Sequence, residues 1–124
     1  MRVLMSIKPE YANAIFSGVK TYEFRRKIFK RKDVSTVVVY VTKPVGKVIG
    51  EFTIDTIISD RPSTIWIKTS QDAGISEGYF NSYFSGVDIG YAIKVGALKK
   101  YEAGGFEISR LGVKRAPQSY MYIE

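Results

Sequence analysis

A lysine, a glutamate and an arginine lie close together in the segment Gly-Val-Lys-Thr-Tyr-Glu-Phe-Arg-Arg, which spans residues 18–26. Tyr22 and Phe24 alternate with Glu23 and Arg25, a pattern typical of a half-buried strand. An arginine can bind phosphate through two parallel hydrogen bonds, and a carboxylate can accept a hydrogen bond from the exocyclic amine of cytosine. We therefore predict that Lys20, Glu23 and Arg25 contact a nucleotide. The alternative is that Glu23 and Arg25 only pair with each other.

A basic run follows directly and continues into a predicted loop, residues 27–33, which we call the basic loop. Neutralising about three to five phosphates of a single strand would give a slope against log salt of roughly −2 to −4. Phe29 could stack on a base. The alternative is that Ile28 and Phe29 anchor the loop to the core while the cations are solvated. The candidate phosphate contacts in this run are Arg25, Arg26, Lys27, Lys30, Arg31 and Lys32.

A third group of candidate contacts lies near the C-terminus, at Lys114, Arg115, Gln118 and Tyr120. These residues could form a second wall of a cleft, with Gln118 reading a base edge and Tyr120 stacking on a base. Alternatively, Pro117 begins an edge strand and Tyr120 packs against the core.

The composition favours a nucleic-acid partner and excludes several kinds of chemistry. The net charge of the 124 residues is +7, and the excess of cations lies within residues 1–50. Such asymmetry predicts a basic face, for which nucleic acid is the commonest partner, although a solvated surface is the alternative. The chain has no histidine and no cysteine, so imidazole catalysis and thiolate metal sites are excluded. We expect no metal and no cofactor.

The elements that must position these residues follow from local patterns. Pro9 suits the first turn of a helix that Gly18 ends, and Gly50 predicts a bulge or a close backbone approach. An aromatic stripe at Tyr79, Phe80, Tyr83 and Phe84 is expected to face the core. Further helices are predicted at 60–69 and 74–86, and strands at 2–7, 20–26, 34–42, 47–58, 90–101 and the C-terminus.

These elements predict one α+β domain over residues 1–124, with five to six strands curled into a small barrel and two to three short flanking helices. No stretch has the length of a signal peptide's apolar region or of a membrane-spanning helix. We therefore expect a soluble, cytoplasmic protein that does not bind a membrane.

One long motif reads Ser6-Ile7-Lys8-Pro9-x-Tyr11-x-x-x-Ile15-Phe16-x-Gly18-x-Lys20-x-Tyr22-Glu23-Phe24-Arg25-Arg26, with further matches up to Pro117-Gln118-Ser119-Tyr120. On these residues the chain resembles the ASCH domain family, a branch of the PUA-like superfamily. The resemblance implies a small β-barrel with a side cleft that holds Lys20, Glu23 and Arg25. It also implies RNA binding linked to the control of transcription or translation.

Some members of the family are enzymes, which adds an alternative function. One bacterial branch hydrolyses N4-acetylcytidine with a lysine, a threonine and a glutamate; the lysine aligns with Lys20, the threonine with Glu23 and the glutamate near Glu77. The chain therefore departs from that branch at Glu23. Other members are ribonucleases. We favour a non-enzymatic module that binds RNA or a modified nucleotide. The alternatives are a hydrolase that uses Lys20 and Glu23 with Glu77 as the proton donor, and a protein-interaction module with protein partners in a regulatory complex.

Overall fold

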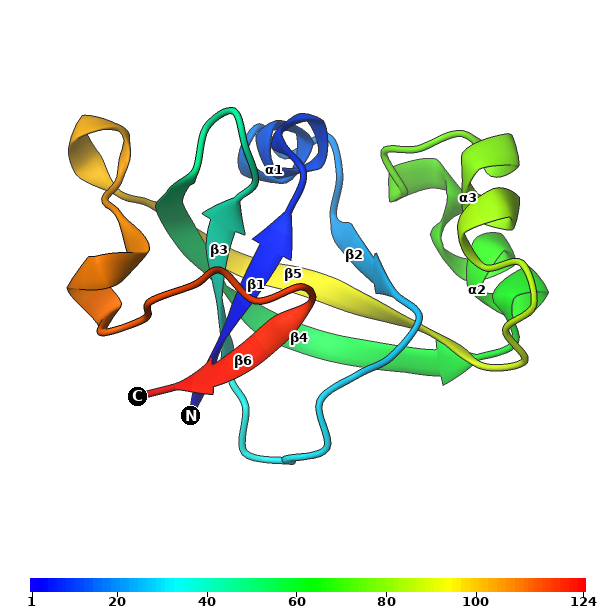
Figure 1. The fold of residues 1–124 in the computed structure, drawn as a ribbon. Coiled ribbons are helices and arrows are strands. Elements are labelled where there is room, and N and C mark those ends of the chain that lie inside the picture. The colour runs from blue at the N-terminus through cyan, green and yellow to red at the C-terminus, as the bar shows by residue number, and fades with distance from the viewer.

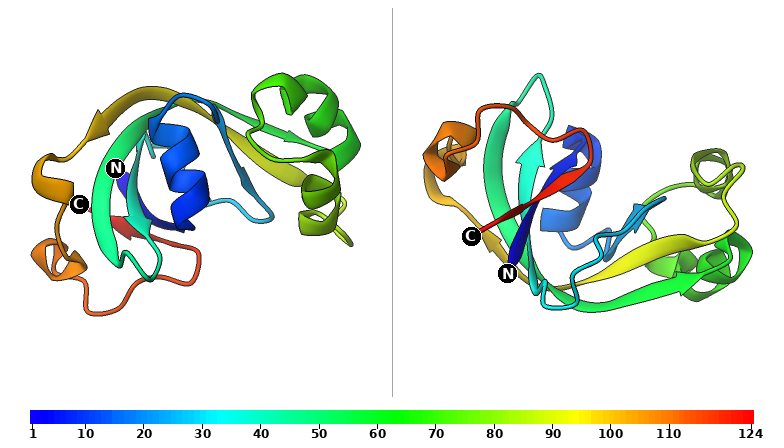
Figure 2. Two further views of the ribbon diagram at one scale, coloured as in Figure 1. Left: turned by 90° about the horizontal axis from the view of Figure 1, so that it is seen from above. Right: turned by 60° about the horizontal axis from the view of Figure 1, so that its bottom comes forward.

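The computed structural model describes all residues, 1–124, and its centre is one sheet of six strands in the order β2-β5-β4-β3-β1-β6. The sheet curls into a half-barrel (Figures 1 and 2). This architecture confirms the predicted α+β class and the predicted number of strands. The strands are β1 (Arg2–Ile7), β2 (Tyr22–Arg25), β3 (Thr36–Val41), β4 (Lys47–Asp60), β5 (Gly90–Lys100) and β6 (Tyr120–Ile123).

The two longest strands, β4 and β5, are antiparallel neighbours that extend beyond the half-barrel. The register between β3 and β4 shifts by one residue beside Gly50. A Cβ atom at Gly50 would lie 2.6 Å from the Lys99 carbonyl oxygen and 2.7 Å from the Phe16 ring. Gly50 is thus both beside a bulge and at a close backbone approach.

Three α-helices flank the sheet: α1 (Pro9–Phe16), α2 (Pro62–Thr69) and α3 (Glu77–Tyr83). Pro9 and Pro62 occupy first-turn positions, where the missing N–H costs nothing. The Ser76 side chain caps α3 by accepting from the Tyr79 N–H. The predicted helix over 74–86 is shorter in the structure, because Gly74 and Gly86 both have positive φ angles. None of the helices has the length and apolar character needed to cross a bilayer.

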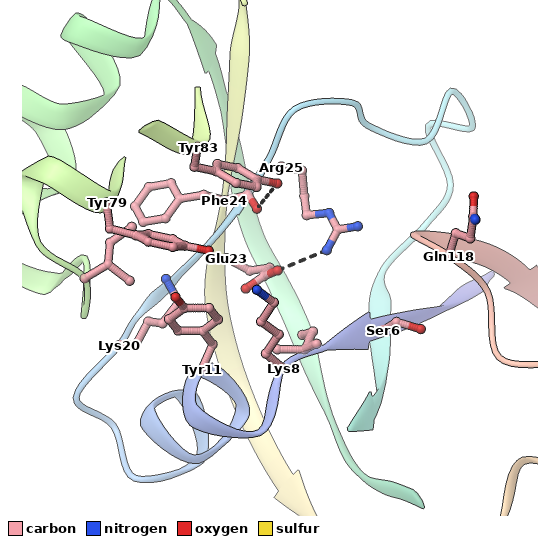
Figure 3. Close-up of a pocket in the computed structure, with 12 residues that line it drawn as sticks. Ser6, Lys8, Tyr11, Lys20, Glu23, Phe24, Arg25, Tyr79, Tyr83 and Gln118 are labelled. Carbon is pink, nitrogen blue, oxygen red and sulfur yellow. Dashed lines mark hydrogen bonds and ion pairs between the residues drawn. The ribbon is translucent and has the colours of Figure 1, made fainter. Parts of the chain in front are cut away.

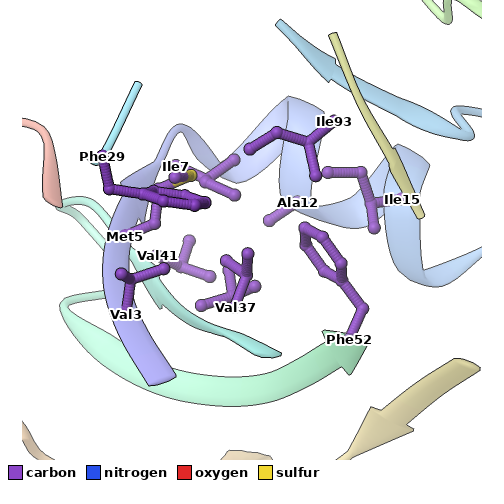
Figure 4. Close-up of a cluster of buried hydrophobic side chains, with 11 residues drawn as sticks. Val3, Met5, Ile7, Ala12, Ile15, Phe29, Val37, Val41, Phe52 and Ile93 are labelled. Carbon is purple, nitrogen blue, oxygen red and sulfur yellow. The ribbon is translucent and has the colours of Figure 1, made fainter. Parts of the chain in front are cut away.

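The core has three clusters, one on each face of the half-barrel and one at the helical end. Figure 4 shows the first cluster, in which Ala12 and Ile15 of α1 pack into the concave side of the sheet against Phe52 and Ile93. A second cluster joins Phe24 of β2 to α2 and α3 through buried aromatic and apolar side chains. β2 therefore presents Tyr22 and Phe24 to the second cluster, and Glu23 and Arg25 project from its opposite face.

The half-barrel stays open between its two edge strands, β2 and β6, which do not pair with each other. Side chains and the basic loop bridge this opening. Arg25, the last residue of β2, donates a hydrogen bond to the Ser119 hydroxyl just before β6. Tyr122 of β6 accepts hydrogen bonds from the backbone N–H groups of Lys30 and Arg31, at 3.0 and 3.2 Å. The two edge strands are therefore linked by side-chain hydrogen bonds and not by a backbone ladder.

Candidate functional site

A pocket of about 300 Å³ lies at the opening, between the end of β1, the start of α1, β2 and α3 (Figure 3). Its walls combine cations, one carboxylate and several aromatic rings. The predicted residues Lys20, Glu23, Arg25 and Gln118 all line it. Its other lining residues are Ser6, Ile7, Lys8, Tyr11, Phe24, Ile75, Tyr79 and Tyr83.

Lys20 is a buried cation that the backbone holds in place. Its side chain is only 3% exposed, and its Nζ donates to the Ala73 carbonyl oxygen at 2.9 Å. The ammonium also lies 4.4 Å from the centre of the Phe24 ring, a cation–π distance. A Cβ atom at Gly74 would come within 2.5 Å of the Lys20 Cβ, so glycine at that position makes room for the lysine.

Burial lowers the pKa of Lys20 from 10.5 to about 8, because the charged ammonium loses its hydration. The nearby carboxylate of Glu23 opposes this shift. At neutral pH Lys20 is therefore mostly charged, but a fraction of it carries a free amine lone pair. A lysine in this state can bind an anion and can also accept a proton.

Glu23 and Arg25 form an ion pair across the pocket wall. Arg25 Nη1 donates to Glu23 Oε2 at 3.2 Å, and the two side chains are only 12% and 8% exposed. The pairing that we considered as an alternative to ligand contact is thus present. The other carboxylate oxygen, Oε1, accepts no hydrogen bond from the protein and is not sealed from solvent. The pair therefore leaves one charged acceptor open to a ligand.

Three tyrosines form the aromatic side of the pocket. The ring centres of Tyr11 and Tyr79 are 5.5 Å apart, and the Tyr79 and Tyr83 rings stack at 6.4 Å and 12°. The Tyr83 hydroxyl donates to the Phe24 carbonyl oxygen at 3.2 Å. Burial raises the pKa of Tyr11 and of Tyr83. Both hydroxyls therefore stay protonated at neutral pH and can donate hydrogen bonds.

The expectation that the whole aromatic stripe of α3 faces the core holds for Tyr83, which packs against the second core cluster, and is wrong for Tyr79. Phe80 and Phe84 are buried as expected, but Tyr79 is 38% exposed and lines the pocket with Tyr83. The sequence did contain a sign of this difference, because Tyr79 and Tyr83 carry hydroxyl groups that a polar pocket can accommodate, whereas Phe80 and Phe84 do not. Tyr11 was not among the predicted contacts, although it too combines an aromatic ring with a polar group.

The basic loop lies outside the pocket, and its one aromatic residue is not accessible. Phe29 is 6% exposed, belongs to the central core cluster and packs edge-on against Tyr120 at 5.9 Å. It therefore cannot stack on a base, which corrects that prediction, and it anchors the loop instead. Arg26 lies near α3 and donates to the Tyr83 carbonyl oxygen at 2.9 Å. The remaining cations of the loop, Lys27, Lys30, Arg31 and Lys32, are exposed.

Of the four C-terminal candidates, only Gln118 lines the pocket. The residue before Gln118, Pro117, is held in place because its carbonyl oxygen accepts a hydrogen bond from the Ser6 hydroxyl at 2.6 Å. Tyr120 packs against Phe29, as the alternative interpretation expected. Lys114 lines a different hollow. Arg115 is exposed and does not line the pocket.

Glu77 does not join Lys20 in the pocket. It is the exposed first residue of α3 and is absent from the pocket wall, which Ile75 and Tyr79 form on that side. Its predicted role as proton donor beside Lys20 has no support in this geometry. The structure contains no cluster of three or more histidine, cysteine, aspartate or glutamate side chains that could hold a metal ion.

Residues 5–100 match the ASCH domain family. The chain belongs to this family. An ASCH domain-containing ribonuclease from Zymomonas mobilis is 36% identical over 85 residues, which cover 68% of this chain and 57% of that protein. A large ribosomal subunit protein uL22 from Ureaplasma parvum is 27% identical over 98% of this chain, which spans 39% of that protein's length.

The fold agrees with a solved ASCH structure. The crystal structure of a tyrosine-to-phenylalanine variant of the ASCH protein from Zymomonas mobilis superposes with a TM-score of 0.89 at 28% identity. The match covers 99% of this chain and 90% of that chain. The ASCH fold therefore extends over the C-terminal segment that the family match does not reach, including Gln118 and Ser119.

Proposed function

We propose that this ASCH domain binds RNA and holds one nucleotide in the pocket between β1, β2 and α3. The observation that carries the proposal is the convergence of Lys20, Glu23 and Arg25 on one small pocket with an aromatic wall. Proteins that recognise single-stranded RNA commonly stack a splayed base on aromatic side chains and bond its edge to polar groups. The name of the Zymomonas mobilis relative also supports RNA as the ligand class.

Each group in the pocket has a distinct part in this proposal. The rings of Tyr79 and Tyr83 offer a surface for the base, and Arg25 and Lys20 supply charge for the phosphate. Glu23 Oε1, which has no partner in the protein, accepts a hydrogen bond from an exocyclic amine. The volume of about 300 Å³ is at the lower end for a ligand pocket. This size favours one nucleotide over a longer segment.

This proposal makes the domain an RNA-binding regulator of transcription or translation, in keeping with the family resemblance and with the cytoplasmic location expected from the sequence. The test is titration of a labelled single-stranded RNA by fluorescence anisotropy. Lys20→Met, which keeps the length of the side chain and removes its charge, should weaken binding by about tenfold or more, as expected for a charged hydrogen bond.

The matched control is Lys68→Met, because Lys68 is half-exposed on α2 and lies outside the pocket. Lys68→Met should bind RNA as the wild type does. If a folded Lys20→Met protein also binds RNA with wild-type affinity, the pocket is not the RNA site and the proposal fails.

RNA cleavage is a second candidate function, favoured by the lowered pKa of Lys20 and by the relative named as a ribonuclease. In this mechanism the neutral Lys20 amine takes the proton of a ribose 2′-hydroxyl. The 2′-oxygen then attacks the adjacent phosphorus while Arg25 stabilises the added negative charge. The 5′-oxygen leaves and takes a proton from water, which gives a 2′,3′-cyclic phosphate and a 5′-hydroxyl end.

An end-labelled RNA tests this candidate. The cleavage rate should increase with pH through about 8, as Lys20 loses its proton, and should be lost in Lys20→Met. A 2′-deoxy substitution at the cleaved position should block the reaction. RNA that remains intact under all these conditions would leave binding as the function.

A further inference from the structure

A second hollow, of about 580 Å³, lies beside the pocket and differs from it in character. One wall is the basic loop with Lys30, Arg31 and Lys32, and the opposite wall is formed by Ile57, Ser59 and Tyr91 of β4 and β5. Figure 1 shows the loop running from the end of β2 past β4 to the start of β3. We call this hollow the loop groove. Its remaining lining residues are Ile28, Phe29 and Val34.

The register of the sheet places the loop groove next to the pocket. Arg25 of β2 lies directly opposite Tyr91 of β5, and Tyr91 lies directly opposite Ser59 of β4. Directly opposed residues of an antiparallel pair project from the same face, with Cβ atoms roughly 5 Å apart. Arg25 lines the pocket, whereas Tyr91 and Ser59 line the loop groove. The pocket and the loop groove are therefore adjacent, and they meet where Arg25, Tyr91 and Ser59 lie side by side on neighbouring strands.

The charge of the loop groove is positive and largely uncompensated. Arg31 is neutralised by Asp33, to which it donates two hydrogen bonds at 2.9 and 2.7 Å. Lys30 and Lys32 are exposed and form no ion pair. Two free ammonium groups on a loop beside an arginine-lined pocket suit an anionic chain that continues from that pocket.

The opposite wall offers an aromatic surface. Tyr91 is half-buried and makes no aromatic pair, unlike Tyr79 and Tyr83 in the pocket. Its neighbours in the groove include the apolar side chains of Ile57 and Val34. Stacking on such a ring is independent of base identity, because every base has a π-face.

We propose that the loop groove is a second subsite, which takes the nucleotide next to the one in the pocket. Tyr91 stacks on its base, and Lys30 and Lys32 contact its phosphates. This inference rests on the proposed function, since it names a single-stranded oligonucleotide rather than a free nucleotide as the ligand.

The test compares nucleoside monophosphates with single-stranded tetranucleotides of the same bases by titration. The wild type should bind the tetranucleotides at least tenfold more tightly than the monophosphates. Tyr91→Ala should weaken tetranucleotide binding by roughly 5- to 100-fold, the loss of one stacked base, and leave monophosphate binding unchanged. Tyr91→Phe keeps the ring and should bind like the wild type.

Substitution of the loop lysines is a second, independent test. Lys30 and Lys32 are exposed, so replacing them should not disturb folding. The Lys30→Ala/Lys32→Ala double variant should weaken tetranucleotide binding and leave monophosphate binding unchanged. Its matched control is Lys99→Ala/Lys100→Ala, which removes the same charge at the opposite end of β5. The control pair should leave both kinds of binding unchanged.

The outcomes separate this inference from the proposed function. If Tyr91→Ala and the Lys30/Lys32 variant bind tetranucleotides like the wild type while Lys20→Met does not, the pocket binds RNA and the inference is overturned. The loop groove would then serve another occupant, such as an acidic protein segment. If Lys20→Met also binds tetranucleotides like the wild type, the proposed function itself fails. Equal weakening of monophosphate binding by Tyr91→Ala would also overturn a separate subsite.

Discussion

Two arginines each pair with a carboxylate two residues away in the sequence, one in the pocket and one in the basic loop. The Arg25–Glu23 pair is 3.2 Å long, with side chains 12% and 8% exposed. The Arg31–Asp33 pair is shorter, at 2.7 Å, but its side chains are 48% and 58% exposed. The same spacing of the same charges therefore produces a buried pair and a solvated pair.

The difference comes from the surroundings and not from the pair itself. Glu23 and Arg25 lie on one face of β2, in a pocket walled by α1 and α3, and little of either side chain is exposed. The basic loop is held by Ile28 and Phe29, which pack against the core, and by hydrogen bonds to Tyr122, and its polar side chains extend into solvent. A buried pair fixes the orientation of its groups, whereas a solvated pair mainly adjusts the local charge.

The two ion pairs should differ most clearly in how much each contributes to the free energy of unfolding. Arg25→Ala leaves the buried Glu23 carboxylate without its partner and should lower the free energy of unfolding by about 2–3 kcal/mol. Arg31→Ala removes a solvated partner and should cause no measurable change. Urea denaturation of both variants measures this contrast. Equal losses would show that burial does not distinguish the two pairs.

The buried ammonium of Lys20 should make stability depend on pH. Its pKa is 10.5 in the unfolded chain and about 8 in the fold, so between these values the unfolded state binds more protons. Stability should therefore rise with pH between about 8 and 10.5, by up to about 3 kcal/mol, and this gain should be lost as the pH falls from 10.5 back to 8. Thermal unfolding at several pH values measures this dependence.

Lys20→Met provides the control for this pH dependence. Above pH 10 the tyrosines act in the opposite direction, because the pKa values of Tyr11, Tyr83 and Tyr101 are raised in the fold. The variant keeps these tyrosines and lacks the lysine, so the difference between the two proteins isolates Lys20. A difference that stays constant from pH 7 to pH 10 would contradict the lowered pKa.

Much of the fold could be predicted because its signals are local. Pro9 and Gly18 bracket α1, Ser76 caps α3, and Gly50 marks the bulge of β4, each through chemistry confined to a few neighbouring residues. Lys20, Glu23 and Arg25 were found together for the same reason, since they are adjacent along one segment. Local patterns do not decide which face of a helix meets solvent, and so Tyr79 was assigned to the core.

The rest of the site depends on contacts between distant segments. Lys8 and Tyr11 reach the pocket because α1 packs into the concave side of the sheet, and Gln118 reaches it because the Ser6 hydroxyl bonds the Pro117 carbonyl. The burial of Phe29 needs a space between β1, β3 and β6 that no local pattern reveals. A phenylalanine among cations suits either an exposed stacking platform or an anchor, and only the tertiary structure decides between them.

The open oxygen of Glu23 should affect which base is bound more than how tightly RNA is bound. Glu23→Gln replaces a carboxylate that only accepts with an amide that also donates. Binding of bases with an exocyclic amine should weaken by about 1 kcal/mol relative to uracil, the change from a charged to a neutral hydrogen bond. Titration of four homopolymeric oligonucleotides measures this preference.

Glu51→Gln is the matched control for the base preference. Glu51 also accepts a hydrogen bond, from the Tyr101 hydroxyl at 2.7 Å, but it lies outside the pocket. This variant should leave the order of the four oligonucleotides unchanged. A uniform loss of affinity in Glu23→Gln for all four bases would mean that Glu23 has only a structural role.

The smallest expected effect is the loss of the phosphate contacts of Lys30 and Lys32, which high salt weakens. Lys30 and Lys32 are exposed, so their contacts with phosphate act by releasing counterions, and the slope of log affinity against log salt should become shallower by about 0.7 for each lysine replaced by alanine. Lys20→Met removes a buried contact and should lower affinity at every salt concentration. Titrations at several salt concentrations separate the two behaviours. An unchanged slope in the Lys30→Ala/Lys32→Ala protein would show that RNA does not reach the basic loop.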